Sequence, residues 1–227
     1  MGLSITSRTG LVAVLFVTAL LAGPARANLL QNGSFEADAF AGLYLTGIPT
    51  GWQPLGNGST VDILISGYGG GMAAEGSRYV DLIGGGIGNF PSGLRQTVHL
   101  LAGESYRLSF DYNGGRYTDG SPTVGAVLEY SLGALLVGSV NVDGLNNFFD
   151  YYPVTSPWGH FAVDVQATSS GDYELRFQTQ SGAWGSPFLD NVVLEGNPVA
   201  EPGSFLLALA GLTLLARRFR RAVCIRR

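Results

Sequence analysis

The stretch Tyr106-Arg107-Leu108-Ser109-Phe110-Asp111-Tyr112 carries a large apolar side chain at every second position and a polar side chain in between. A period of two is that of a β-strand with one face buried and the other in solvent. No segment of the sequence keeps the 3.6-residue period of an amphipathic helix over three turns. The stretch therefore predicts a strand, and it sets the fold class expected of the sequence around it.

The same alternation recurs at 161–165 and 173–178, and other apolar runs have the length of a strand. These further runs are Val61–Ile65, Arg78–Ile83, Leu94–Leu100, Val124–Tyr130, Leu135–Val142 and Phe188–Leu194. Glycine-rich or turn-forming segments separate them. About eight to ten short strands in this arrangement predict an all-β fold, a sandwich or jelly roll, in one domain over residues 28–198.

The charge distribution divides the chain into three parts. The sequence has no lysine and 13 arginines, of which six lie in the last eleven residues. The part between the two ends holds five arginines against all 17 acidic residues, a formal balance of −12. A body with this charge repels nucleic acid, and it is compatible with calcium or with neutral ligands such as sugars.

Little in the sequence supports catalysis. The only cysteine, Cys224, lies in the basic end, so the body has no disulfide, no thiolate nucleophile and no cysteine zinc site. His99 and His160 are the only histidines, and their spacing is not that of metal ligands. No serine stands in a G-x-S-x-G elbow. A chance pair of carboxylates, as glycosidases use, is the one enzymatic alternative left open.

The first 27 residues have the three parts of a secretory signal peptide. Arg8 supplies the positive charge, Leu11–Ala22 is the apolar region, and Ala25-Arg26-Ala27 is a small-x-small cleavage site. We therefore expect export, with Asn28 as the first residue of the mature protein. The alternative is an N-terminal anchor that is not cleaved.

The other end combines Glu201-Pro202, the apolar stretch Phe205–Ala216 and an arginine cluster. The apolar stretch is shorter than the roughly 20 residues of a relaxed transmembrane helix. It shows no polar face, so we expect a short transmembrane helix over 204–216 rather than a soluble amphipathic one. The positive-inside rule would leave the arginines in the cytoplasm and the acidic body outside.

This end, residues 199–227, resembles the PEP-CTERM sorting signal of Gram-negative bacteria. Val199, Ala200, Glu201 and Pro202 stand at the sorting motif, with Ala200 where the family has its first proline. The resemblance implies export through the inner membrane and a membrane-anchored stage before processing by an exosortase. It also implies a final place at the cell surface or in an extracellular matrix, in bacteria that make extracellular polysaccharide.

Several phrases of the body resemble the galactose-binding-like jelly roll, especially its carbohydrate-binding modules. They are Asn28–Glu36 followed by Gly51-Trp52, then Glu75–Leu82, Leu94–Val98 leading into Ala102–Tyr106, and Phe188–Leu194. The ordered set spans nearly the whole body. In this family Trp52 resembles a buried framework position.

The resemblance also implies a structural calcium ion. By position it assigns carboxylate ligands to Glu36, Glu75 and Asp190, and backbone carbonyl ligands to Ser34 and Arg78. Calcium takes six to eight oxygen ligands, and carboxylates distant in sequence converge only in the folded chain. The alternative is that Glu36 and Glu75 are solvated while Asp190 caps a turn.

Aromatic side chains outside the clean alternation are candidates for stacking on sugar rings. They are Tyr68, Tyr117, Tyr151, Tyr152, Trp158 and Trp184. Aromatic residues of a sandwich also serve as core. The sequence thus predicts an exported, surface-directed, non-enzymatic protein that binds extracellular polysaccharide, with a structural or adhesive surface protein as the alternative and a polysaccharide hydrolase as a third.

Overall fold

The computed structural model describes residues 27–56, 60–84, 91–115, 126–143, 145, 157–179 and 186–196. Four predicted ligand residues, Tyr117, Tyr151, Tyr152 and Trp184, lie outside these ranges, as do the predicted sorting segment 199–227 and all but the last residue of the predicted signal peptide. Within the described ranges, no helix has the length and apolar character needed to cross a membrane.

The described residues form eleven strands and one short 3-10 helix, η1 (Tyr68–Gly70). The strands are β1 (Tyr44–Gly47), β2 (Gln53–Pro54), β3 (Val61–Ile65), β4 (Arg78–Asp81), β5 (Gly93–Leu100), β6 (Ser105–Gly115), β7 (Val127–Leu132), β8 (Leu136–Asn141), β9 (Gly159–Gln166), β10 (Gly171–Thr179) and β11 (Ser186–Gly196).

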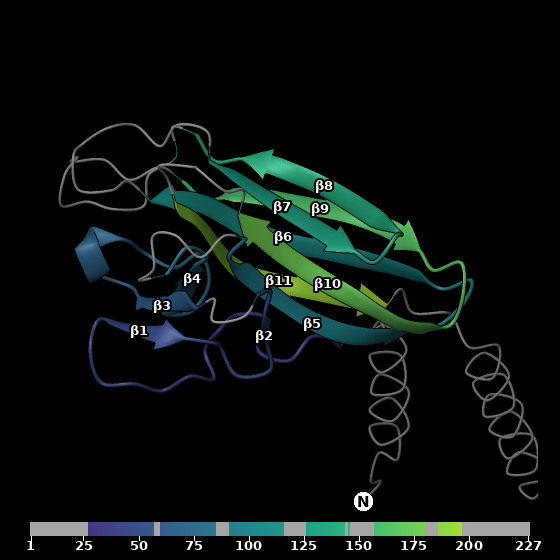
Figure 1. Cartoon of the computed structure of the whole chain (residues 1–227), viewed down its shortest axis with the longest axis horizontal. Helices are drawn as coiled ribbons and strands as arrows, with labels where there is room; N and C mark the ends of the chain where they lie inside the picture. Colours follow the sequence, from purple (N-terminus) through teal and green to yellow (C-terminus); the bar gives the residue numbers. More distant parts are fainter. Residues whose placement is uncertain are drawn as a thin grey trace, which may run out of the picture. The chain divides into compact units, whose positions relative to one another are not determined.

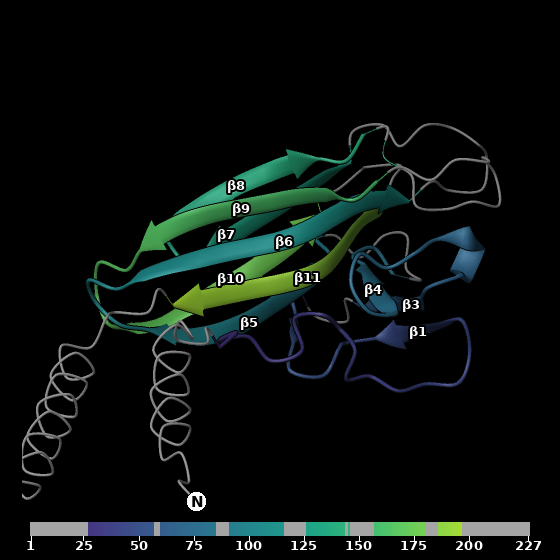
Figure 2. The same cartoon turned by 180° about the vertical axis from the view of Figure 1, so that it is seen from behind.

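Two antiparallel sheets contain all eleven strands. One has the order β1-β3-β4-β11-β6-β9 and the other the order β2-β5-β10-β7-β8. In Figure 1 the five-stranded sheet lies in front, with β10, β7 and β5 before β11, β6 and β9, and Figure 2 shows the reverse. The prediction of an all-β sandwich is confirmed.

The inner faces of both sheets supply the main core. Phe110 of β6 lies at its centre, with ring centroids 5.0 Å from Phe177 and 5.2 Å from Tyr130 across the sandwich and 4.8 Å from Phe161 within its own sheet. Trp52 is only 5 % exposed and joins this core, as predicted from its place in the sequence. The alternation at 106–112 is therefore the pattern of a strand whose apolar face fills the space between the sheets.

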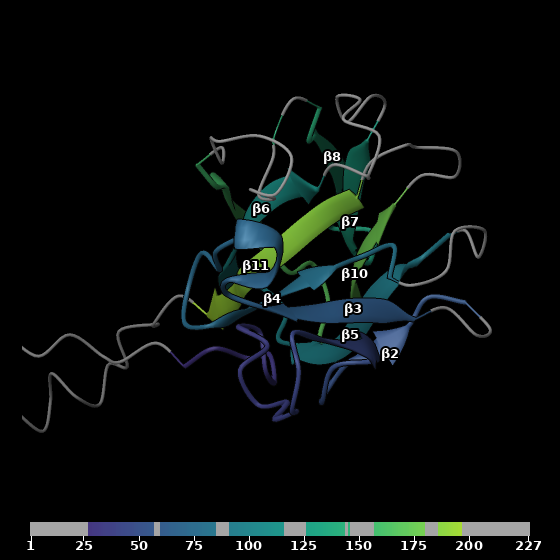
Figure 3. The same cartoon turned by 90° about the vertical axis from the view of Figure 1, so that its left-hand side faces the viewer.

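A second, smaller apolar cluster lies on the outer face of the six-stranded sheet. Its buried members are Leu64, Tyr79 and Phe188, which alternate along their strands with residues of the main core. Tyr68, Ala73 and Trp158 pack against it. Figure 3 shows β1, β3 and β4 side by side at this end of the molecule, with η1 close by.

Every strand predicted from the sequence is present, with bounds that differ by a few residues. The prediction missed β1, β2 and η1. β1 is exposed or half-buried at all four positions, and β2 has only two residues, so neither carries the alternation that reveals a strand.

The packing around Phe110 predicts a large loss of stability on truncation. Phe110→Ala should lower the free energy of unfolding by about 3–5 kcal/mol, because it leaves a cavity where aromatic rings of both sheets meet. Leu101→Ala, at a side chain that is 54 % exposed, should cost less than about 0.5 kcal/mol. Urea denaturation of both variants measures the difference, and equal losses would contradict this account of the core.

Candidate functional site

The opening residues dock onto the last strand. The Asn28 side chain donates to the carbonyl of Val192 (3.1 Å) and accepts the N–H of Leu194 (3.0 Å). The N–H of Val192 donates to the carbonyl of Gly33 (2.9 Å). A β-carbon on Gly33 would lie 2.0 Å from the Val192 oxygen, so this close approach requires glycine.

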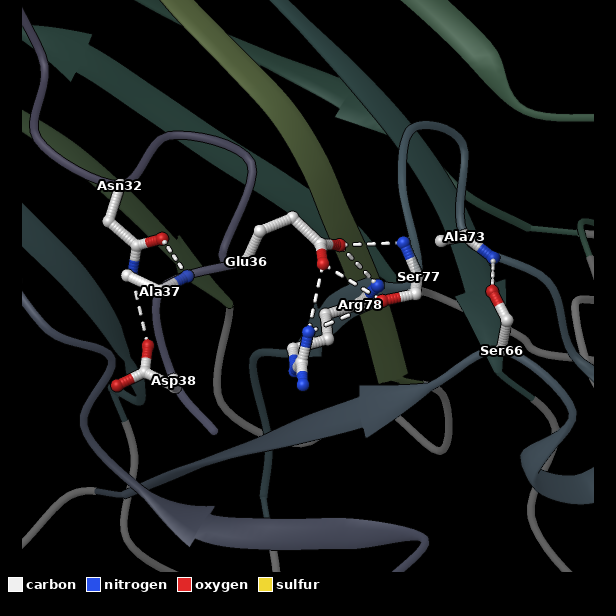
Figure 4. Close-up of polar contacts among 8 residues, drawn as sticks. All are labelled: Asn32, Glu36, Ala37, Asp38, Ser66, Ala73, Ser77 and Arg78. Atoms are coloured by element: carbon white, nitrogen blue, oxygen red, sulfur yellow. Dashed lines mark hydrogen bonds and ion pairs between the residues drawn. The ribbon is translucent and has the colours of Figure 1, made fainter. Parts of the chain in front are cut away.

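Glu36 lies three residues after Gly33, and its carboxylate hydrogen-bonds to the turn that precedes β4 (Figure 4). Its Oε1 accepts the N–H groups of Ser77 and Arg78 at 2.6 Å each. Its Oε2 accepts the hydroxyl of Ser77 (2.8 Å) and Nη1 of the Arg78 guanidinium (2.9 Å). Although partial burial acts to raise it, these hydrogen bonds leave the pKa of Glu36 below its ordinary value.

Asp190 of β11 holds the same turn from the other side. Its Oδ2 accepts the N–H groups of Ala74 (2.8 Å) and Glu75 (3.0 Å), and its Oδ1 accepts the N–H of Asn191 (2.7 Å). Asp190 therefore caps a turn. The carboxyl is fully buried, and burial raises its pKa to about 7.

Asp81 is a second buried carboxyl on the outer face of the six-stranded sheet. It accepts the hydroxyl of Ser186 and the N–H of Ile83 (2.9 Å). Burial raises its pKa to about 7 as well. Nearby, the buried hydroxyl of Tyr79 has no hydrogen-bond partner among the described residues. Burial raises the pKa of Tyr79 above its ordinary value.

The structure thus brings four of the five predicted calcium ligands, Glu36, Glu75, Arg78 and Asp190, to one turn, and the fifth, Ser34, is half-buried two residues before Glu36. The three carboxyl groups are not gathered around one point. Glu36 and Asp190 face backbone N–H groups, and Glu75 is exposed. No group of three or more acidic, histidine or cysteine side chains in the described part of the chain is placed to hold a metal. As they lie, these residues do not fit a calcium ion, and the calcium site stays a prediction that a chelator would test.

The outer face of the five-stranded sheet has a hollow of about 370 Å³ between β10, β7 and β8. The strand register aligns Gln178, Glu129 and Ser139 in one row across these strands. The next row aligns Arg176, Ser131 and the 78 % exposed Val137. The hollow is therefore lined by hydrogen-bonding side chains with one apolar wall.

A network of ion pairs holds the Arg176 side chain in place at the edge of this hollow. Glu174 forms ion pairs with Arg176 on its own strand and with Arg95 of β5, the latter at 2.9 Å. Although partial burial acts to raise it, the hydrogen bonds and charges of Arg176 and Arg95 leave the pKa of Glu174 below its ordinary value. The hollow could not be predicted from the sequence, because each of its residues alone has the pattern of a solvent-facing position on an ordinary strand.

The described aromatic candidates lie on the other sheet. Trp158 donates its indole N–H to the carbonyl of Met72 (2.9 Å) and meets the Tyr79 ring edge-on at 5.6 Å. Tyr68 packs on the same cluster, 5.5 Å from the ring of the half-exposed Tyr44. Tyr68 and Trp158 are thus brought together over the second apolar cluster and not at the polar hollow.

Comparisons with known proteins bear on the fold. No family model matches the sequence, and no curated protein matches it significantly. Among solved structures, a cyclase from Fischerella sp. TAU is 20 % identical, and the match covers 77 % of this chain and 99 % of the cyclase with a TM-score of 0.57. The chain therefore shares the fold of that protein.

Two further likenesses are to domains whose printed names describe carbohydrate-binding modules. TmCBM61, solved in complex with beta-1,4-galactotriose, is 20 % identical, with 74 % of this chain and 97 % of that chain covered and a TM-score of 0.45. The CBM22-1 xylan-binding domain of Paenibacillus barcinonensis Xyn10C is 18 % identical, with 79 % and 100 % covered and a TM-score of 0.45. Neither likeness bears on what this chain binds.

The two buried carboxyls predict that stability falls as the pH rises to neutrality. With a pKa of about 7 against an ordinary value of 3.8, the folded protein keeps protons that the unfolded chain releases. The contribution of these two carboxyls to the free energy of unfolding is complete below about pH 4, and it is lost as the pH rises through 7. Asp81→Asn keeps an oxygen acceptor for Ser186 and Ile83 but does not titrate.

Melting temperatures at pH 5 and pH 8 measure this effect. The decrease in the wild type should exceed that in Asp81→Asn by about 5–10 °C. Asp164→Asn, at a carboxylate that is 62 % exposed, should behave as the wild type. An unchanged pH dependence in Asp81→Asn would show that Asp81 does not hold its proton in the folded state.

Proposed function

We propose that this chain is an exported, surface- or matrix-directed, non-enzymatic protein whose galactose-binding-like jelly roll binds neutral polysaccharide. The observation that carries the proposal is the polar hollow on the five-stranded sheet, with Arg176, Gln178 and Glu129 around it. Its volume of about 370 Å³ is within the range of about 300–1,000 Å³ usual for ligand sites. The ordered phrases that resemble carbohydrate-binding modules support the same reading.

The side chains around the hollow suit a ligand rich in hydroxyl groups. A sugar hydroxyl both donates and accepts, so it needs carboxylate or amide oxygens together with guanidinium or amide N–H groups. Glu129 and Gln178 are joined by a hydrogen bond, and Arg176 is oriented by Glu174. Ordered groups of this kind lose little rotational freedom when a ligand binds.

The charges around the hollow favour a neutral ligand over an acidic one. Arg95 and Arg176 share the single carboxylate of Glu174, and Glu129 in the lining balances the one positive charge that remains. The body as a whole has five arginines against 17 acidic residues. Because this field repels polyanions, uronic-acid or sulfated glycans should bind less well than neutral ones.

We further propose that the two ends of the chain serve export and sorting. Residues 1–27 would direct secretion and be removed, and Val199–Pro202 with the apolar stretch and arginines would hold the protein at the inner membrane for an exosortase. Polysaccharide made outside the cell would then be the natural ligand. The alternative is a structural or adhesive surface protein without sugar specificity.

Glycan binding by the 28–198 domain tests the first proposal. A screen of neutral and acidic polysaccharides should find saturable binding to a neutral one, and Arg176→Ala should weaken it by about tenfold or more through loss of charged hydrogen bonds. Arg107→Ala is the matched control, because Arg107 also forms an ion pair on a strand, is 45 % exposed against 48 % for Arg176, and lies on the other sheet.

If Arg176→Ala binds the glycan as tightly as the wild type, the binding site lies on another surface, such as the one around Tyr68 and Trp158. The absence of binding to every glycan would favour the structural alternative, and a search for protein partners would follow.

Deletion of residues 201–227 tests the sorting proposal. In a cell with an exosortase, the shortened protein should be released in soluble form, because the apolar stretch and the arginines are removed together. Cell fractionation followed by immunoblotting measures the distribution. Retention in the membrane at the wild-type level would place the anchor elsewhere, for example in an uncleaved N-terminus.

A further inference from the structure

A side-chain cation, the guanidinium of Arg78, occupies the junction at which the sequence predicts a metal ion. Its Nη1 lies 2.9 Å from Oε2 of Glu36 and 3.3 Å from the hydroxyl of Ser77. Its central carbon lies 5.6 Å from the centroid of the Phe40 ring, within the range of a cation–π contact. The Arg78 side chain is 20 % exposed, so its charge is largely removed from solvent.

Glu36 has no acceptor position left for a metal. An ionised carboxylate offers about four lone-pair positions on its two oxygens. Here Ser77 N–H and Arg78 N–H occupy two on Oε1, and the Ser77 hydroxyl and Arg78 Nη1 occupy two on Oε2 (Figure 4). A calcium ion could bind Glu36 only by displacing these donors.

The surrounding backbone holds Glu36 in this arrangement. Gly76 has φ +65°, and a β-carbon on it would lie 2.6 Å from Oε1 of Glu36. The turn is also held by Asp190, which uses three of its own acceptor positions on backbone N–H groups. The carboxyl oxygens of Glu36 and Asp190 thus face backbone N–H groups, whose partial positive charge a metal ion would repel.

We propose that the guanidinium of Arg78 replaces the metal ion at this junction, so that the domain joins its opening residues to β4 without calcium. The guanidinium provides the positive charge that Glu36 requires, and it adds directed hydrogen bonds that a spherical ion lacks. Arg78 therefore acts through its side chain, whereas the sequence resemblance assigned it only a carbonyl ligand. The proposal is independent of what the hollow binds.

Thermal unfolding of the full chain in detergent tests the proposal. The melting temperature should be the same with excess chelator and with millimolar calcium. Arg78→Met should lower it by about 3–6 °C under both conditions, because Glu36 is left without its counter-charge. Arg107→Met, which removes the exposed pair with Asp164 (3.2 Å), should change it by less than about 2 °C.

A wild-type melting temperature that falls with chelator would overturn the proposal, as would an Arg78→Met variant that melts like Arg107→Met. Direct calcium titration of the wild type by calorimetry decides the matter even if Arg78→Met does not fold. We expect no stoichiometric binding. A one-to-one heat signal that Glu36→Gln abolishes would show that a metal, and not Arg78, closes the junction.

Discussion

The contact between residues 28–36 and β11 is the constraint on which the sandwich depends. It joins the first described residues to the last described strand, which lies in the middle of the six-stranded sheet. Such a long-range closure has an entropic cost, and directed hydrogen bonds of Asn28 and Gly33 to β11 offset it, together with those of Glu36 to the turn before β4. The sequence has no cysteine before residue 224, so hydrogen bonds and one ion pair, and no disulfide, close the domain at this point.

The sequence predicted the sheets well because most strands bury one face. Phe110 and its alternate neighbours face the core, and the polar residues between them face away, so the pattern is visible without the structure. β1 failed this test because Tyr44 and Leu45 are both exposed at the edge of the sheet. An edge strand with no buried face has no periodicity to read, although its backbone pairs regularly with β3.

Sequence identified the acidic residues of the junction but not their partners. The resemblance assigned Glu36 and Asp190 as carboxylate ligands by position, yet their main donors are backbone N–H groups, which nearly every residue carries. The hollow was invisible for a related reason. Glu129, Ser139 and Gln178 meet only through the register of β10, β7 and β8, and the pairing of β10 with β7 joins segments about 50 residues apart.

The outer faces of the two sheets differ in their packing. The β3-β4-β11 end of the six-stranded sheet is covered by the cluster of Leu64, Tyr79 and Phe188, and the buried carboxyls Asp81 and Asp190 stabilise the chain there. The outer face of the five-stranded sheet carries the half-buried Glu129 and Gln178 and the exposed Arg176 around a hollow. Arg78 contacts Glu36, Ser77 and Phe40, whereas Arg176 pairs with Glu174, so substitutions at the two arginines remove different sets of contacts. Their effects should therefore add, which separates the energetics of closing the domain from those of binding a ligand.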